Sequence, residues 1–252
     1  MKIFCVSLFL VISSCSLYPQ SLDDDVLLPI DAGVDNREII YTKYASGGLS
    51  FLTHGYQASF RRQHTRSAFY EHGYEIDLSL IRHPKEVSVR SGAYLGSKPY
   101  CYGKVNTHIN LRAGYGLNKE IASRVDMGAV EINAYVAGGL SLAVLKPVYL
   151  YVADEEGIVK RRYDPEKYPQ SAIMGGTWFF NGLERSNFHP GIYLKAAINF
   201  DYSIKEKNIL TLEVGTVIDY YFTDVKIMKS PAKNYSLYNA FYISMFFGKK
   251  WN

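Results

Sequence analysis

SLYNAFYISMFFGKKW occupies residues 236–251, close to the C-terminus of the chain. Every second residue from Leu237 to Phe247 is apolar except Asn239, whereas the residues between them are small, polar or aromatic. A period of two matches an extended strand, whose side chains point alternately to opposite faces. The run is much longer than the roughly 5–6 residues of an ordinary soluble strand. It is typical of the closing strand of an outer-membrane β-barrel.

The composition of the 252 residues favours the same class of fold. Hydrophobic residues make up 48% and aromatic residues 15%, with 22 tyrosines. Aromatic residues favour β-strands, and tyrosine also favours interfaces between apolar and aqueous surroundings. No uncharged apolar segment after the N-terminus reaches the roughly 20 residues that a membrane-spanning helix requires. The net charge of +4 is small and its basic residues are scattered, so we expect no nucleic-acid partner.

The N-terminus resembles a targeting signal. Lys2 is followed by an apolar run from Ile3 to Ile12 and then by small residues, so residues 1–21 are predicted to be a signal peptide. The sequence before Cys15 also resembles a bacterial lipobox, which would make Cys15 a lipidated first residue. Residues 22–47 are expected to form an N-terminal periplasmic segment. Cys101 would then be a lone thiol in the mature barrel, residues 48–252.

Alternating stretches predict an all-β fold, an antiparallel up-and-down transmembrane barrel of about eight strands, with ten possible. A soluble sandwich also has alternating strands, but these runs approach or exceed the ~9–11 residues that cross a bilayer, and their apolar faces are uninterrupted. Gly138-Gly139 is interpreted as a turn or a bulge between two of them. The expected strands are Gly48–Arg62, Phe69–Arg82, Cys101–Tyr115, Gly128–Ala137, Leu140–Ala153, Gly191–Ser203, Ile209–Phe222 and Ser236–Trp251.

The expected strand order also predicts which connections face outward, if both termini are periplasmic. The outward connections would be Gln63–Ala68, Gly116–Met127, Asp154–Pro190 and Thr223–Tyr235, of which the long loop 154–190 is the most extensive. His83–Tyr100 would then be periplasmic, although it is long for a periplasmic turn.

Charged residues recur on the polar faces of these strands and are predicted to point into the lumen. A barrel of eight strands is only wide enough for its own side chains, so these charges must pair with one another. Such a network would plug the barrel; the alternative is a narrow, porin-like path for ions. The predicted lumen network is Glu75, Asp77, Lys104, Arg112, Glu131, Lys195, Asp201, Glu213 and Asp219.

No pattern in the sequence predicts catalysis, a cofactor or a metal site. The histidines lack a metal-like spacing, and there is no phosphate loop or dinucleotide fingerprint. Outer-membrane lipases and deacylases use Ser and His on a strand near the outer end of the barrel. His54 is the candidate base for this alternative, on a face shared with Leu52, Tyr56 and Phe60, but no serine partner lies on that face.

Several blocks of the sequence carry a family resemblance. They are His83-Pro84-Lys85-Glu86, Tyr102-Gly103-Lys104-Val105-Asn106, Leu111-Arg112-Ala113-Gly114-Tyr115-Gly116, the stretch from Gly139 to Leu150, Tyr163-Asp164-Pro165-Glu166-Lys167, and Phe247-Gly248-Lys249-Lys250-Trp251. Together they resemble a largely uncharacterised family of outer-membrane β-barrel proteins of Bacteroidota, over most of residues 48–252. The chain departs from the family at Gly139-Leu140-Ser141, where Gly-Pro-Ser is expected.

The resemblance implies a role as an accessory subunit in outer-membrane protein assembly or secretion. We therefore expect a non-enzymatic barrel in the outer membrane of a Gram-negative bacterium, in contact with lipid and with other envelope proteins. The alternatives are a lipid-modifying hydrolase of the deacylase or lipase type and a narrow channel. Lys249, Lys250 and Trp251 are predicted to anchor the last strand at the membrane interface, because Trp and Lys favour that region.

Overall fold

The computed structural model describes residues 42–67, 70–92, 97–123, 130–154, 157–202, 208–229 and 234–251. The predicted signal peptide and Cys15 lie outside these residues. Residues 43–47, expected in the N-terminal segment, belong instead to the first strand.

Eight strands form a closed antiparallel barrel, which confirms the predicted fold class. Neighbours in the barrel are neighbours in the sequence, and the first and last strands pair from Lys43 with Trp251 to Leu52 with Tyr242. The barrel strands are β1 (Lys43–Leu52), β2 (Gly55–Ser67), β3 (Tyr70–Ile81), β6 (Asn106–Ala122), β7 (Glu131–Pro147), β11 (Asn187–Asp201), β12 (Asn208–Val225) and β13 (Tyr235–Trp251).

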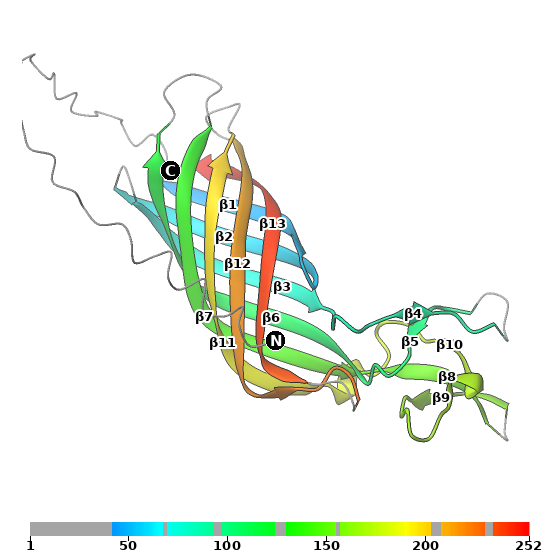
Figure 1. Cartoon of the computed structure of the whole chain (residues 1–252). Coiled ribbons are helices and arrows are strands. Elements are labelled where there is room, and N and C mark those ends of the chain that lie inside the picture. The colour runs from blue at the N-terminus through cyan, green and yellow to red at the C-terminus, as the bar shows by residue number, and fades with distance from the viewer. Residues whose placement is uncertain are drawn as a thin grey trace, which may run out of the picture. The chain divides into compact units, whose positions relative to one another are not determined.

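The remaining elements lie beyond one end of the barrel, opposite the C-terminus (Figure 1). We call this the loop end, and the end that holds Lys43 and Trp251 the terminal end. The strands β4 (Ser88–Val89) and β5 (Tyr100–Cys101) form one small sheet, and β8 (Tyr149–Asp154), β9 (Gly157–Arg162) and β10 (Ile173–Gly176) form another. Two 3-10 turns, η1 (Gln170–Ala172) and η2 (Leu183–Arg185), complete the long connection between β7 and β11.

These loop elements have a small core of their own. Tyr100, Leu150, Val152, Tyr163 and Ile173 are buried together there. The β3–β6 and β7–β11 connections therefore pack together around a shared apolar interior. In the residues that the structure describes, no helix is long and apolar enough to cross a membrane.

The barrel strands alternate as the sequence predicts, with polar side chains inside and apolar ones outside. All eight strands expose large hydrophobic residues on the outer face. In β13 the exposed large hydrophobic residues are Tyr235, Leu237, Phe241, Ile243, Met245 and Phe247, whereas Tyr242, Ser244 and Phe246 are buried inside. The closed barrel contradicts the sandwich alternative, and its largely apolar outer face agrees with this, because a soluble monomer rarely exposes an apolar patch of more than a few hundred Å².

The number of barrel strands was predicted correctly, but at two places the chain was divided into strands wrongly. The expected strand Gly48–Arg62 is a hairpin, in which β1 and β2 meet at the two-residue turn Thr53-His54. Neither turn residue is among those that favour tight hairpins, which hid the turn in the sequence. The structure instead requires glycine at Gly55, where a Cβ would lie 1.9 Å from the carbonyl oxygen of Leu80.

The second error offsets the first. The stretch expected to form two strands around Gly138-Gly139 is one continuous strand, β7, which Pro147 ends. Gly139 pairs with Gly114 across the β6–β7 ladder, and a Cβ on Gly139 would lie 2.3 Å from the carbonyl oxygen of Ala113. The two glycines therefore allow close strand approach within a regular ladder. The remainder of that stretch, after Pro147, forms β8 at the loop end.

The hairpin at Thr53-His54 also changes the side on which the early connections lie. The connections at the loop end are 53–54, 82–105, 148–186 and 226–234, and those at the terminal end are 68–69, 123–130 and 202–207. Gln63–Ala68 and Gly116–Met127 were expected on the same side as the long loop 154–190, and that expectation was wrong, because they lie at the terminal end. His83–Tyr100 lies at the same end as the other long connections, and not at the opposite end where it was expected.

Candidate functional site

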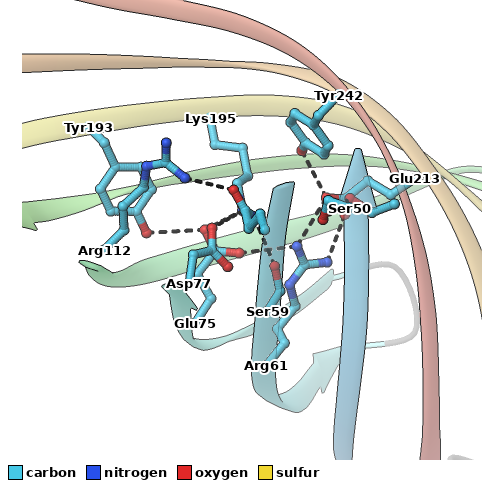
Figure 2. A network of polar contacts seen from close by, with 12 residues as sticks. Ser50, Ser59, Arg61, Glu75, Asp77, Arg112, Tyr193, Lys195, Glu213 and Tyr242 are labelled. Atoms are coloured by element: carbon cyan, nitrogen blue, oxygen red, sulfur yellow. Dashed lines mark hydrogen bonds and ion pairs between the residues drawn. The ribbon is translucent and has the colours of Figure 1, made fainter. Parts of the chain in front are cut away.

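Arg61 of β2 lies at the centre of a buried ion network in the lumen (Figure 2). Its guanidinium donates to both carboxylate oxygens of Glu213, at 2.8 and 3.2 Å, and to Glu75 at 3.1 Å. The same group lies over the rings of Tyr135 and Phe246, with Cζ 3.8 and 4.3 Å from the ring centroids. One side chain thus joins β2 to its neighbour β3 and, across the lumen, to β12.

Lys195 of β11 provides the second cation of the network. Its Nζ lies 2.5 Å from Asp77 Oδ2 and 3.0 Å from Glu75 Oε1, and all three side chains are fully buried. Glu75 is therefore shared between Lys195 and Arg61. A buried cation with two carboxylate partners offsets much of the desolvation cost that an unpaired charge would carry.

Arg112 and Asp219 form a third pair nearer the loop end. Arg112 Nε and Nη2 donate to the two oxygens of Asp219 at 2.8 and 2.7 Å, which is the bidentate geometry favoured by guanidinium and carboxylate. Arg112 Nη1 donates to Gln57 at 2.7 Å, and Ser141 donates to Asp219 at 3.0 Å. The pair is thus held by neighbours on several strands.

Three tyrosines complete the coordination of the network carboxylates. Tyr135 and Tyr193 each donate to Glu75, at 2.9 and 3.1 Å, and Tyr242 donates to Glu213 at 2.8 Å. Each tyrosine ring extends over a glycine that leaves room for it. An added Cβ on Gly116, Gly114 or Gly215 would lie 2.1, 2.4 or 2.8 Å from the phenolic oxygen of Tyr135, Tyr193 or Tyr242, respectively.

The network contains three cations and four carboxylates. Two of its buried atoms, Arg61 Nε and Asp77 Oδ1, have no hydrogen-bond partner among the described residues. The surrounding side chains are packed against one another, and the pocket at the terminal mouth has a volume of only about 40 Å³. The arrangement can hold charge inside the barrel, but it leaves little space for a substrate.

The structure brings together six of the nine predicted lumen residues: Glu75, Asp77, Arg112, Lys195, Glu213 and Asp219. Glu131 and Asp201 lie apart from them in the terminal mouth, where Asn133 donates to both at 3.0 and 2.8 Å. Lys104 is not in the lumen. It precedes β6 at the loop end and pairs with Glu86 at 2.7 Å, because β6 begins at Asn106 and not at Cys101.

The prediction missed Arg61, the cation on which the network depends. The signal was present, since Gln57, Ser59 and Arg61 alternate with Tyr56 and Phe60 in the way that marks the other strands. The single strand assigned from Gly48 to Arg62 obscured it, because the turn at Thr53-His54 was not recognised.

The hydrolase candidate His54 does not lie on a strand. It belongs to the β1–β2 turn, where Thr53 Oγ1 lies 3.1 Å from His54 Nδ1. Leu52 and Tyr56 lie on opposite faces of the wall, one buried and one exposed, so the shared face expected from the sequence was wrong. In the described ranges, no group of His, Cys, Asp and Glu has the arrangement of a metal site.

The predicted anchors lie together at the terminal end of β13. Lys250 Nζ is 5.1 Å from the centroid of the Tyr44 ring on β1, and Trp251 pairs with Lys43 in the ladder. Cys101 is a free cysteine at the loop end. Burial raises the pKa of its thiol.

Comparison with known proteins finds a likeness in solved structures only. No family model matches the chain, and no curated protein matches it. Neisserial surface protein A is 9% identical, with a TM-score of 0.38, over 83% of this chain and 95% of that one. The attachment invasion locus protein Ail of Yersinia pestis, in complex with the heparin analogue sucrose octasulfate, is 7% identical, with a TM-score of 0.37, over 84% and 99%. Both are outer-membrane barrels of eight strands.

Proposed function

We propose that this protein is a non-enzymatic barrel of the outer membrane of a Gram-negative bacterium, and that it acts through its loop end as a structural or accessory subunit of an envelope complex. The filled lumen is the observation that carries the proposal. A barrel whose interior is occupied by paired charges has its outer wall and its end connections left for function.

The outer wall supports a lipid environment. Exposed apolar side chains occur on all eight barrel strands, and these strands are 10–18 residues long, which suffices to cross a bilayer at a tilt. Two polar side chains on this wall, Thr216 and Asn239, bond to each other, because the Thr216 hydroxyl donates to Asn239 at 3.0 Å. Such a wall favours lipid over water.

The lumen supports a sealed barrel. Arg61, Arg112 and Lys195 connect β2, β3, β6, β11 and β12 through ion pairs that cross the interior. Moving one of these charges aside would leave its partners unpaired in a closed space, at a cost of several kcal/mol. Ion passage is therefore disfavoured.

The loop end supports a role in binding. Three long connections gather there, and two of them share a buried apolar core. An ordered surface unit on a rigid scaffold is the usual place for recognition. The exposed Trp178, Phe179 and Phe180 add an aromatic cluster on the same connection.

Two measurements test the membrane and lumen parts of the proposal. Unboiled protein should migrate differently from boiled protein on a gel and fractionate with the outer membrane. In planar bilayers the purified barrel should carry no discrete current. Stepwise conductance at neutral pH would support the channel alternative instead.

The subunit role is tested by its partners. Envelope proteins should co-purify with the detergent-solubilised chain, and a variant in which residues 148–186 are replaced by a short Gly-Ser turn should lose them while keeping its gel shift. Lipid-ester hydrolysis that disappears in His54→Ala would favour the hydrolase alternative and contradict the non-enzymatic assignment.

A further inference from the structure

A pocket of about 780 Å³ lies at the loop end, where three connections meet. Three segments of the chain form its walls, and they contribute Val105 and Asn106, then Arg161, Arg162, Tyr163, Asp164, Lys167 and Tyr168, and finally Lys226, Met228, Lys229 and Asn234. Five of its lining residues are basic, and one, Asp164, is acidic. The basic residues are Arg161, Arg162, Lys167, Lys226 and Lys229.

Two of these cations already have carboxylate partners. Lys229 Nζ lies 2.9 Å from Asp164 and 2.8 Å from Glu166, so its charge is offset. Arg161 is 3.7 Å from Asp154, and both side chains are partly exposed, which makes the pair weak. Arg162, Lys167 and Lys226 form no ion pair with any carboxylate in the part of the chain that the structure describes.

The backbone that carries these cations is held by side-chain hydrogen bonds. Asn234 Oδ1 accepts from the backbone amides of Ile227 and Met228, and its Nδ2 donates to the carbonyl of Met228. Asn106 Nδ2 donates to the carbonyl of Lys226 at 2.8 Å. The Lys229 bridge ties this segment to the wall formed by residues 161–168, so the pocket is formed before any ligand binds.

Protection of a sheet edge explains only some of the basic residues around the pocket. β9 is an edge strand of its sheet, and charged side chains at an edge deter pairing with other chains. That accounts for Arg161 and Arg162. It does not account for Lys226, which comes from the β12–β13 connection and lines the same pocket.

We infer that this pocket binds a saccharide that carries phosphate or sulfate esters. Guanidinium groups bind such oxyanions in bidentate fashion, and the volume matches the 300–1,000 Å³ range typical of small-ligand sites. The half-buried Tyr168 lies among the cations, and a sugar ring can pack against its ring. The compact pocket fits a dense cluster of anions on a sugar better than an extended acidic peptide.

The inference rests on the proposed function only in that the loop end faces envelope saccharides. The experiment uses the full chain in detergent micelles and a fluorescent dextran sulfate oligomer as the probe. Neutral dextran and poly-glutamate serve as competitors. Because exposed charge interactions are screened by salt, binding should weaken steadily as sodium chloride is raised from about 0.05 to 0.5 M.

The decisive variant is Arg162→Glu with Lys226→Glu. Loss of two charge-assisted contacts should weaken probe binding by about tenfold or more. The matched control is Lys85→Glu, an exposed basic residue on another loop-end connection that does not line the pocket, and it should bind within about twofold of the parent protein. Unboiled gel migration should be the same for all three proteins, which separates loss of binding from loss of the fold.

Several results would overturn the inference. The double variant binding as tightly as the parent would exclude this pocket as the site. Poly-glutamate competing as well as unlabelled dextran sulfate at equal charge would show recognition of charge without a sugar. The absence of a gel shift in the parent protein would instead count against the proposed membrane barrel. Failure of the saccharide inference and failure of the proposed function can therefore be told apart.

The source of the saccharide is distinguished in nanodiscs. If discs that contain lipid A reduce binding of the soluble probe relative to phosphatidylcholine discs, the pocket takes the phosphorylated sugar of a membrane glycolipid. Equal binding in both discs assigns the pocket to a soluble anionic saccharide.

Discussion

Gly116 of β6 lies directly against the ring of Tyr135 of β7: a Cβ at position 116 would come within 2.1 Å of the tyrosine oxygen. That oxygen donates to Glu75, which Arg61 and Lys195 share. A missing side chain on one strand thus allows a tyrosine on the next to reach the centre of the lumen. Gly116, like Gly114 and Gly215, thus leaves the space that a hydrogen-bonding tyrosine occupies in the lumen.

Gly116→Ala should therefore destabilise the barrel by forcing Tyr135 away from Glu75. We expect a loss of about 1–3 kcal/mol in the free energy of unfolding, as for other overpacked sites. Urea titration in detergent, followed by tryptophan fluorescence and gel shift, measures it. Gly47→Ala is the control, because its Cβ would approach nothing closer than 3.9 Å.

The same pair allows a rescue. Tyr135→Phe removes the atom closest to the new methyl group, so the double variant should lose less than the sum of the two single losses. Strict additivity of Gly116→Ala and Tyr135→Phe would mean that the methyl group and the hydroxyl do not meet, contrary to the structure.

Arg61→Ala should be one of the most destabilising single changes in the lumen. It leaves Glu75 without one of its two cations and Glu213 with none, and removing one partner of a buried pair typically costs about 3–5 kcal/mol. Urea titration of the refolded barrel measures the loss. The neighbouring Arg62→Ala is the control, since Arg62 is exposed, and it should change stability by no more than about 0.5 kcal/mol. Equal effects of the two changes would contradict a central role for Arg61.

The sequence predicted the fold class because alternation is local and is preserved along each strand. It predicted six members of the lumen network for the same reason. Glu75, Asp77 and Glu213, for example, lie on the polar face of strands whose other face is plainly apolar. Alternation does not say where a strand ends. Thr53-His54 contains none of the residues that usually mark a turn, so the turn there was missed. Gly138-Gly139 has the residues of a turn, but β7 continues through it as one strand.

Pairing across the barrel could not be predicted from one strand at a time. Arg61 and Glu213 are 152 positions apart, and only the closed sheet places them at 2.8 Å. The match between Gly116 and Tyr135 likewise depends on the register of β6 with β7, in which Asn118 opposes Tyr135. The basic pocket requires three connections to meet at one end, which follows only after the first hairpin is recognised.

The carboxyl group of Asp164, which forms an ion pair with Lys229, should have a pKa below the ordinary value for aspartate. The hydrogen bonds from Lys229 and from the backbone of Glu166 lower the pKa of Asp164 from its ordinary 3.8. A depressed folded pKa stabilises the tether above the unfolded pKa, and this contribution is lost as the pH falls through the folded value. Carboxyl NMR titration should show the pKa of Asp164 rising in Lys229→Met; an unchanged pKa would argue against the tether.

Trp251 should lie at the membrane interface, as predicted from the end of β13. The chain has two tryptophans, and Trp178 is exposed at the loop end, so a Trp178→Phe variant reports on Trp251 alone. Lipids brominated near the headgroup should quench its fluorescence more strongly than lipids brominated near the bilayer centre, because tryptophan favours the interface. Stronger quenching at the centre would exclude an anchoring role.

His54 provides the sharpest test of the strand order. As part of an outward turn it should be reachable from outside the cell, whereas a continuous strand from Gly48 to Arg62 would bury it at membrane depth. In a Cys101→Ser background, His54→Cys should react with a membrane-impermeant maleimide on intact cells. Asn208→Cys, at the terminal end of β12, should react only after the outer membrane is permeabilised. If only Asn208→Cys reacted on intact cells, the terminal end would face outward, opposite to the proposed orientation. If His54→Cys failed to react even after permeabilisation, His54 would not lie in an exposed turn.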